Sequence, residues 1–143
     1  MFLGTFNNSI DAKNRVIVPA KFRDKLGSGC ILTIGIENCL CIYSREDFEV
    51  LADKMAGIPD SAIKARAFVR AVFSSASECE FDKQGRIIVP PNLKKRANIE
   101  KELVTLGVRN RIEIWAKEVW EMEENEAMPD TEELAEALAQ HGF

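Results

Sequence analysis

Residues 11–20, DAKNRVIVPA, and residues 82–91, DKQGRIIVPP, spell nearly the same stretch twice, 71 positions apart. Farther along the chain, residues 32–48 align with residues 104–120 after a shift of one position. Two matched blocks in the same order indicate an internal repeat, the pattern that has to be identified before any other when a fold is predicted. The chain therefore contains two copies of one supersecondary unit.

We assign the first copy to residues 5–47 and the second to residues 76–119, with a helical connector over 48–75 and an acidic tail over 120–143. The chain has 143 residues, 46% of them hydrophobic, which is enough to bury a core. One copy holds only a few short strands and cannot bury its own apolar face. Two copies that pair with each other cover the exposed strand edges, so we predict one pseudo-twofold domain.

Each copy has the same predicted layout. An extended segment leads into a D-x-x-x-R turn, a β-branched strand follows, and a proline starts a short helix. Two strands around a Gly/Asn turn complete the unit. The predicted elements are extended segments at Thr5–Ile10 and Cys79–Phe81, strands at Val16–Val18 and Ile87–Val89, helices at 20–26 and 91–97, and strand pairs at 30–35 with 36–43 and at 102–107 with 108–115. Two further helices are predicted. One, at 44–55 with Ser44 as its cap, begins just before the connector, and the other lies within it at Ser61–Phe73. The fold class is therefore α+β and mainly β, a tandem-repeat barrel with short flanking helices.

The composition argues against a membrane or secreted protein. No run of about 18 apolar residues exists, so we expect no membrane span. The N-terminal MFLGTFNNSID has no basic region and no long apolar run, which argues against a secretory signal. Four cysteines in such a chain favour reduced thiols and a cytoplasmic location; they are Cys30, Cys39, Cys41 and Cys79.

The charge is unevenly distributed along the chain. All 19 Lys and Arg residues lie in residues 1–117 beside 14 acidic residues, so this body has a net charge of about +5. Residues 118–143 hold nine acidic residues and neither Lys nor Arg, so the tail has a net charge of about −9. A basic body with an acidic tail indicates a polyanionic partner.

The D-x-x-x-R stretch predicts a tight turn. Asn14 in the first copy and Gly85 in the second are the residue types that best accept a positive φ. Asp11 and Asp82, at the start of each turn, can accept backbone N–H bonds and an ion pair from the arginine that ends the motif. One interpretation of the aspartates is therefore structural, as a clasp that fixes the turn.

The arginines of the motif have a second interpretation. Residues 11–25 carry a net charge of +3 and residues 82–96 carry +4, so two basic turns on one compact barrel form an electrostatic footprint for phosphates. An arginine aimed at a guanine edge adds base selectivity. The alternative is ordinary solvated charge. The candidate DNA-binding residues are Arg15, Arg86, Lys13, Lys83, Lys21 and Arg23.

The sequence contains no spacing of residues that is typical of a catalytic or metal site. Cys39 and Cys41 lie on one strand face, but their repeat equivalents are Arg111 and Glu113 and no nearby histidine completes a tetrahedral set. Buried strand cysteines are the favoured interpretation, with a zinc site as the alternative. His141 is the only histidine and lies near the end of the chain, so no Cys–His or Ser–His pair is expected. We predict no enzyme activity, no metal and no cofactor.

The acidic tail has a predicted break at Pro129 and then a short helix with Leu134 and Leu138. It is either a solubilising, loosely docked segment or a competitor of DNA for the basic turns.

Four segments together resemble the MraZ family, which is built from two SpoVT/AbrB-type swapped-hairpin units. They are MFLG at 1–4, DAKNRVIVPAKFR at 11–23, ASECEFDKQGRIIVPPNLKKRA at 76–97 and LGVRNRIEIWAKEVW at 106–120. The resemblance extends from Met1 to about Trp120 and includes both motif copies in the right order. It departs from the family pattern at Asn14, where the family favours Gly.

The resemblance implies a DNA-binding, nucleoid-associated transcriptional regulator of the bacterial division and cell-wall gene cluster. It also implies a ring-shaped homo-oligomer that binds direct repeats in a promoter. By the matching motif, Arg15 and Arg86 are the expected DNA contacts, Asp11 and Asp82 shape the turns, and Lys13 fits the pattern of the first copy. Two alternatives stay open: an antitoxin-like protein of the same fold and a ring-forming interaction scaffold. No small-molecule substrate is expected.

Overall fold

The computed structural model describes residues 1–127 and 130–143. In chain order its elements are β1 (Phe2–Ser9), β2 (Arg15–Ile17), α1 (Ala20–Leu26), β3 (Gly29–Ile34), β4 (Leu40–Tyr43), α2 (Arg45–Ala56), α3 (Ile63–Ser75), β5 (Ser77–Glu80), β6 (Arg86–Ile88), α4 (Pro91–Arg96), β7 (Glu102–Arg109), β8 (Arg111–Ala116), α5 (Lys117–Ala127) and α6 (Thr131–Ala139). The predicted α+β fold is confirmed, the described strand pairs are antiparallel, and the elements of the two copies follow each other in the same order.

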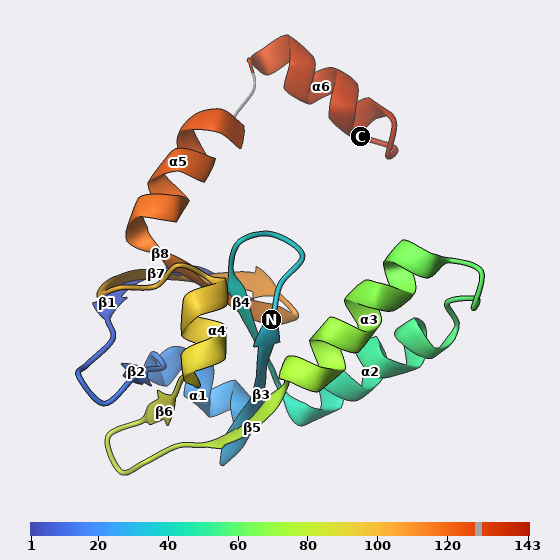
Figure 1. Ribbon diagram of the computed structural model, residues 1–143. Helices are drawn as coiled ribbons and strands as arrows, with labels where there is room; N and C mark the ends of the chain where they lie inside the picture. The colour runs from blue at the N-terminus through green and yellow to red at the C-terminus, as the bar shows by residue number, and fades with distance from the viewer. Residues whose placement is uncertain (128–129) are drawn as a thin grey trace.

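Six strands form one antiparallel sheet in the order β1-β7-β8-β4-β3-β5 (Figure 1). The hairpin β3–β4 of the first copy is flanked on its outer side by β5 of the second copy. In return, the hairpin β7–β8 of the second copy is flanked by β1 of the first. Each hairpin is thus completed by a strand of the other copy, which gives the swapped-hairpin arrangement that the family resemblance implies.

The pairing registers define the pseudo-twofold axis. Strands β2 and β6 form a separate two-stranded ribbon in which Val16 pairs with Ile87, and these two residues are repeat equivalents, 71 positions apart. In the large sheet β4 pairs with β8, and there Cys41 pairs with its own repeat equivalent, Glu113. A residue that pairs with its own equivalent lies on the axis, so the axis passes through both of these pairs.

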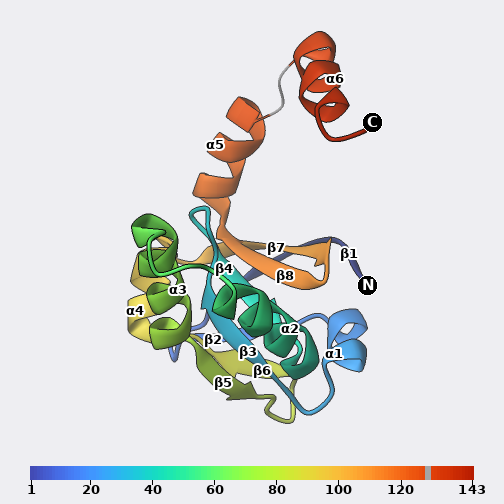
Figure 2. The ribbon, with the colours of Figure 1, turned by 90° about the vertical axis from the view of Figure 1, so that its right-hand side faces the viewer.

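The β2–β6 ribbon lies between the two edges of the large sheet. Strand β2 contacts β1, and β6 contacts β5 (Figure 2). Asn8 of β1 donates a hydrogen bond from Nδ2 to the carbonyl oxygen of Ile17 at 2.9 Å. The hydrogen-bonded ladders of the described residues form two sheets, with the ribbon in contact with β1 and β5, and no continuous ladder closes the predicted barrel among these residues.

The core fixes the ribbon from its inner side. Val16 and Ile87 are each 1% exposed and pack in the main hydrophobic cluster with Phe22 of α1 and Leu93 of α4, which are repeat equivalents. Full burial of a side chain of this size stabilises a fold by about 1.5–3 kcal/mol. Because side chains alternate along each ribbon strand, the burial of Val16 and Ile87 turns the residues on either side of them toward solvent.

The connector forms the two predicted helices, shifted by one or two residues. Ser44 caps α2 by accepting a hydrogen bond at Oγ from the backbone N–H of Asp47 at 3.0 Å. The predicted strand over residues 36–43 is shorter than expected, because the N–H of Gly35 bonds to the carbonyl of Cys39 and residues 36–39 form the hairpin tip.

Helices α5 and α6 extend from the end of β8 away from the sheet (Figures 1 and 2). Helix α6 is capped by Asp130, and the predicted helix break at Pro129 lies outside the described residues. None of the helices that the structure describes is both long enough and apolar enough to cross a membrane.

Candidate nucleic-acid interface

Both D-x-x-x-R turns have the backbone conformation that the sequence predicts. Asn14 has φ 60° and Gly85 has φ 78°, the left-handed region that Gly and Asn tolerate best. Each turn leads directly into a strand of the ribbon. The residue after that strand donates its backbone N–H to the opposite turn, from Val18 to Gly85 and from Val89 to Asn14. The two turns and the two strands are therefore one hydrogen-bonded unit.

The first turn is held by Asp11. Its Oδ1 accepts the backbone N–H groups of Lys13 and Arg15 at 2.9 and 2.8 Å. Its Oδ2 accepts Nε–H of Arg15 at 2.7 Å. One carboxylate thus fixes both the backbone of the turn and the direction of the guanidinium.

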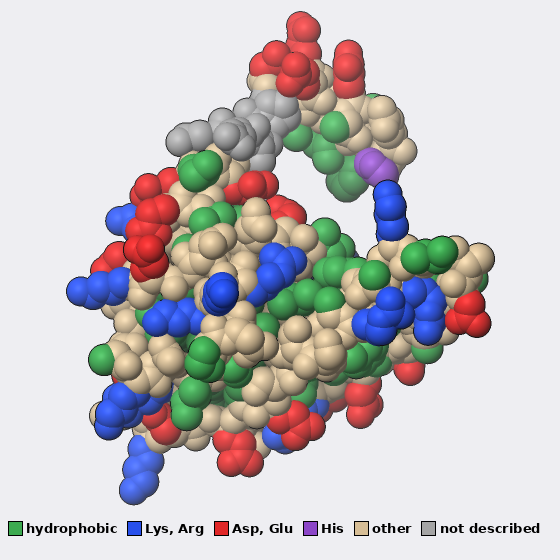
Figure 3. All heavy atoms as spheres, viewed as in Figure 1, with side chains coloured by type: hydrophobic (Ala, Val, Ile, Leu, Met, Phe, Trp, Pro, Cys, Tyr) green, Lys and Arg blue, Asp and Glu red, His purple; other side chains and the backbone are tan. Residues whose placement is uncertain are grey.

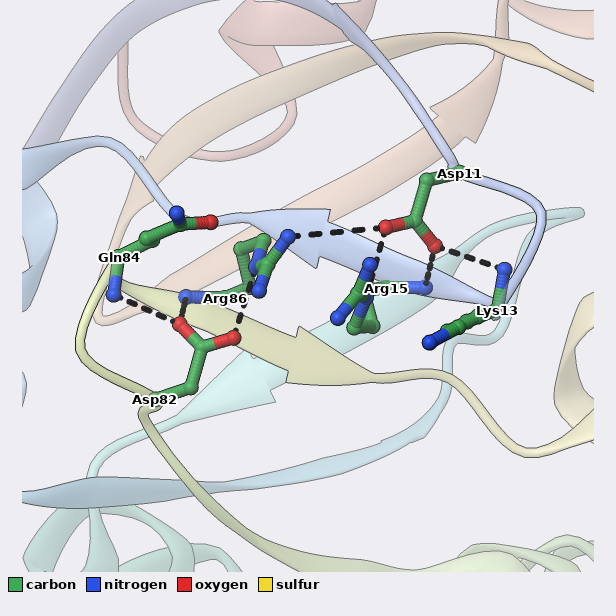
Figure 4. A network of polar contacts seen from close by, with 6 residues as sticks. All are labelled: Asp11, Lys13, Arg15, Asp82, Gln84 and Arg86. Atoms are coloured by element: carbon green, nitrogen blue, oxygen red, sulfur yellow. Dashed lines mark hydrogen bonds and ion pairs between the residues drawn. The ribbon is translucent and has the colours of Figure 1, made fainter.

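The second turn repeats this geometry (Figure 4). Oδ1 of Asp82 accepts the backbone N–H groups of Gln84 and Arg86, each at 2.9 Å, and Oδ2 accepts Nε–H of Arg86 at 2.7 Å. The clasp expected from the sequence is therefore present in both copies. It uses Nε of each arginine, so the terminal Nη groups are not part of either clasp.

One contact joins the two clasps. Nη1 of Arg86 lies 3.8 Å from Oδ2 of Asp11, across the ribbon. The side chains of Arg15 and Arg86 are 29% and 22% exposed, so they are accessible but held against the surface. Oriented guanidinium groups lose less rotamer entropy on binding a planar or anionic ligand than mobile side chains do.

The clasps lower the pKa of both aspartates. For Asp11 the largest cause is the hydrogen bond from the backbone N–H of Arg15, and for Asp82 it is the equivalent bond from Arg86. The ion pairs with the same arginine side chains add to the effect. Both carboxylates are therefore ionised at neutral pH.

Basic side chains from α1 and α4 contact the turn of the opposite copy. A Cβ atom placed on Gly85 would lie 1.4 Å from Nη1 of Arg23, so the guanidinium occupies the space that any side chain at this position needs. The repeat equivalent of Arg23 is Lys94, whose Nζ donates to Oδ1 of Asn14 at 3.1 Å. Each turn residue is thus matched to a basic side chain of the other copy. Gly85 leaves room for Arg23, and Asn14 accepts a hydrogen bond from Lys94.

The other candidate residues lie at different distances from the ribbon. Lys13 and Lys83 are exposed within the two turns, next to the clasps. Lys21 is exposed on α1, and no hydrogen bond or ion pair joins it to the ribbon among the described residues. Its role as a DNA contact stays a prediction from sequence.

Two isoleucines of the ribbon were missed by the reasoning from sequence. Ile17 and Ile88 are 51% and 63% exposed on the outward face. Ile17 pairs with Arg86, and Ile88 pairs with Arg15. The alternating pattern of the two ribbon strands carries this information, since every second residue shares the face of the arginine.

The Cys39–Cys41 pair lies beside a third group that can bind metal. The two Sγ atoms and a carboxylate oxygen of Glu113 are all within 4.8 Å of one another. Both carboxylate oxygens of Glu113 are already engaged, with Nε–H of Arg111 on Oε2 and Nε1–H of Trp115 on Oε1, each at 3.0 Å. Cys39 and Cys41 are 2% and 3% exposed. The hydrogen bond of the Cys39 thiol with Cys41, together with burial, raises the pKa of Cys39. Buried strand cysteines around a satisfied ion pair account for this cluster.

The surface charge follows the asymmetry of the sequence. Acidic side chains gather over α5 and α6 in Figure 3, whereas the body below carries Lys and Arg side chains together with Asp and Glu side chains. The described part of the acidic tail is thus carried away from most of the body and its basic residues.

A pseudo-twofold body of two swapped hairpins, with an Asp–Arg turn from each copy on one exposed ribbon, defines a tandem-repeat protein with two basic turns on one face. The chain belongs to the MraZ family. The model of this family, described as "MraZ protein, putative antitoxin-like", matches residues 1–71 and again residues 72–141.

Curated relatives extend over the whole chain. The chain is 49% identical over 143 residues to "Transcriptional regulator MraZ" of Clostridium tetani, with 100% of both chains covered. It is 48% identical over 138 residues to the protein of that name from a Thermoanaerobacter species, with 96% of both chains covered. The relative from Alkaliphilus metalliredigens is 45% identical over 143 residues, again with 100% of both chains covered.

Proposed function

We propose that this protein is a sequence-specific, DNA-binding transcriptional regulator and that the outward face of the β2–β6 ribbon is its DNA contact. The observation that carries the proposal is the pair of clasped arginines, Arg15 and Arg86, which lie side by side on this face and are oriented by hydrogen bonds to Nε that leave their Nη groups outside the clasps. A two-stranded ribbon fits the major groove of DNA, where guanine offers two acceptors to a guanidinium. The names of the curated relatives support the regulatory role.

The residues around the arginines fit a division of labour. Lys13 and Lys83 in the turns bind phosphates, and Arg23 lies close enough to Gly85 to join them. Asp11 and Asp82 act on DNA only through the arginines that they orient. Phosphate contacts supply most of the affinity and base contacts supply the specificity. The protein has a binding role on this account and no catalytic one.

A single ribbon makes few contacts with DNA, so the proposal includes self-assembly. In a ring-shaped homo-oligomer several identical ribbons bind neighbouring direct repeats with a raised effective concentration. Repeats about one helical turn, roughly 10 bp, apart present the same groove to successive protomers. The target we propose is the promoter of the division and cell-wall gene cluster, which places the protein in the cytoplasm at the nucleoid.

The test is a fluorescence anisotropy titration with the DNA upstream of this protein's own gene and with a scrambled DNA of equal length. The account predicts tighter binding to the upstream DNA, and a log Kd that changes with log salt by roughly 0.9 per phosphate contact. Equal and weak binding to both DNAs contradicts the regulator and leaves a ring-forming scaffold as the better description.

An antitoxin-like role is the second candidate, because the description of the matching family model includes it. The described tail, with its acidic helix α6, is the segment that such a role would use to bind a basic toxin. Co-purification of a stoichiometric toxin encoded next to this gene supports the antitoxin, and its absence together with specific promoter binding supports the regulator.

A further inference from the structure

The outward face of the β2–β6 ribbon holds two exposed isoleucines beside its two arginines. Ile17 is 51% exposed and Ile88 is 63% exposed, while Val16 and Ile87 on the inner face are each 1% exposed. A single exposed isoleucine needs no explanation. Here, however, two repeat-equivalent positions expose one on the same ribbon. Each of them lies directly opposite one of the clasped arginines.

We propose that Ile17 and Ile88 contact the C5 methyl groups of thymines in the major groove, and so read thymine beside the guanines bound by the arginines. This inference rests on the proposed DNA-binding function. The major groove offers two features that match this face: the N7 and O6 acceptors of guanine for a guanidinium, and the thymine methyl for an apolar side chain. Lys13 and Lys83, exposed at the two ends of the ribbon, provide the charge complementarity to a phosphate backbone.

The dimensions of the ribbon agree with this arrangement. Successive residues of a strand rise about 3.3 Å, so Arg15 and Ile17 are separated by about 7 Å along β2. That distance matches two base-pair steps of roughly 3.4 Å each. Across the ribbon, directly paired residues such as Ile17 and Arg86 lie about 5 Å apart. The preferred site therefore has a thymine within about two base pairs of each contacted guanine.

The two isoleucines have different surroundings. Glu78 and Glu80 of β5 line the same hollow as Ile88. The positions of β1 that are equivalent to these two glutamates are the uncharged Asn7 and Ser9. Carboxylates repel the phosphates of an approaching duplex, so Ile17 contributes more to thymine recognition than Ile88.

The experiment compares the upstream DNA of this gene, amplified with thymine, with the same DNA amplified with uracil. Uracil pairs identically and lacks only the C5 methyl. Anisotropy titrations with wild-type protein are expected to show weaker binding to uracil DNA, by about fourfold for each lost methyl contact. The Ile17→Ser variant is expected to lose most of this difference and Ile88→Ser a smaller part. Ile63→Ser is the matched control, because Ile63 on α3 is 75% exposed and distant from the ribbon.

The outcomes separate the inference from the proposed function. If wild-type protein binds neither DNA better than scrambled DNA, the proposed function fails and the inference fails with it. If it binds specifically but equally to thymine and uracil DNA, only the inference is overturned. The inference is also overturned if the uracil effect persists in Ile17→Ser and Ile88→Ser, since DNA shape is then the cause. Thermal melting of each variant checks folding, and light scattering shows whether the isoleucines instead join two copies of the chain, a result that likewise overturns the inference.

Discussion

Asp11 lies between two arginines: its Oδ2 accepts Nε–H of Arg15 at 2.7 Å and is 3.8 Å from Nη1 of Arg86 across the ribbon. The clasp of the second copy has the same internal geometry, but among the described residues no equivalent ion pair joins Asp82 to Arg15. The two repeats are therefore not electrostatically equivalent at the proposed DNA contact. The first-copy aspartate holds both guanidinium groups, and this asymmetry makes the two copies distinguishable by experiment.

We expect Asp11→Asn to reduce sequence specificity more than Asp82→Asn, because the first change loosens both arginines and the second loosens one. Either change removes a negative charge, so it also strengthens non-specific phosphate binding. The measurement is therefore the ratio of Kd values for scrambled and upstream DNA, at one salt concentration. Equal ratios for the two variants would show that the 3.8 Å contact has no role in orienting Arg86.

The match between Arg23 and Gly85 predicts a rescue. Gly85→Asn places a side chain where the guanidinium of Arg23 lies, so we expect a loss of stability of roughly 1–2 kcal/mol. Adding Arg23→Lys recreates the Lys94–Asn14 pair of the other turn and is expected to restore at least half of that loss.

Urea denaturation of wild type, both single variants and the double variant gives the coupling free energy, expected at about 0.5–3 kcal/mol for groups in contact. Strictly additive effects would mean that Arg23 moves aside without cost.

Asn8 supports the ribbon from the large sheet. Its Nδ2 donates to the carbonyl of Ile17, and its Oδ1 accepts from the hydroxyl of Thr105, which is 1% exposed. Asn8→Ala leaves both partners without this side chain, and we expect a loss of about 1–3 kcal/mol in the free energy of unfolding. Asn7→Ala, on the neighbouring position of β1, is the control and is expected to cost less. Similar losses for the two variants would contradict the anchoring role.

The lowered pKa of the clasp aspartates has a defined consequence for pH dependence. A carboxylate whose folded pKa is below its unfolded value stabilises the fold fully above the unfolded pKa, about 3.9 for Asp, and loses that stabilisation as the pH falls through the folded pKa. We therefore expect the clasps to be intact down to about pH 4. Carboxyl NMR titration measures this directly. In Arg15→Ala, the pKa of Asp11 is expected to rise only in part, because the backbone N–H bond is the largest cause and remains.

The repeat made much of this structure predictable. The spacing of the two motifs predicted the order of the elements, and the helix expected at 20–26 has those bounds in the structure. The left-handed conformation of Asn14 and Gly85 followed from residue type, because few other residues accept a positive φ. These features are local, so a short stretch of sequence contains the information that determines them.

Several of the contacts that were missed lie between the two copies. The nearness of Asp11 to Arg86 and of Arg23 to Gly85 depends on how the repeats face each other. From the sequence, Glu113 was known only as the repeat equivalent of Cys41. In the structure it pairs with Cys41 on the pseudo-twofold axis and forms an ion pair with Arg111. Periodicity gives the face on which a residue lies, but it does not name the strand that pairs with it.

The most direct test of the account is the effect of Arg15→Ala and Arg86→Ala on binding to the upstream DNA, with Arg70→Ala as the control. All three variants lose one positive charge, but Arg70 is exposed on α3, away from the ribbon. The account predicts that each ribbon variant weakens specific binding roughly 10- to 100-fold, as loss of a bidentate guanine contact does, while Arg70→Ala stays near wild type. Equal effects of all three variants, or wild-type affinity in Arg15→Ala and Arg86→Ala, would contradict it and leave the two clasps as purely structural elements of the turns.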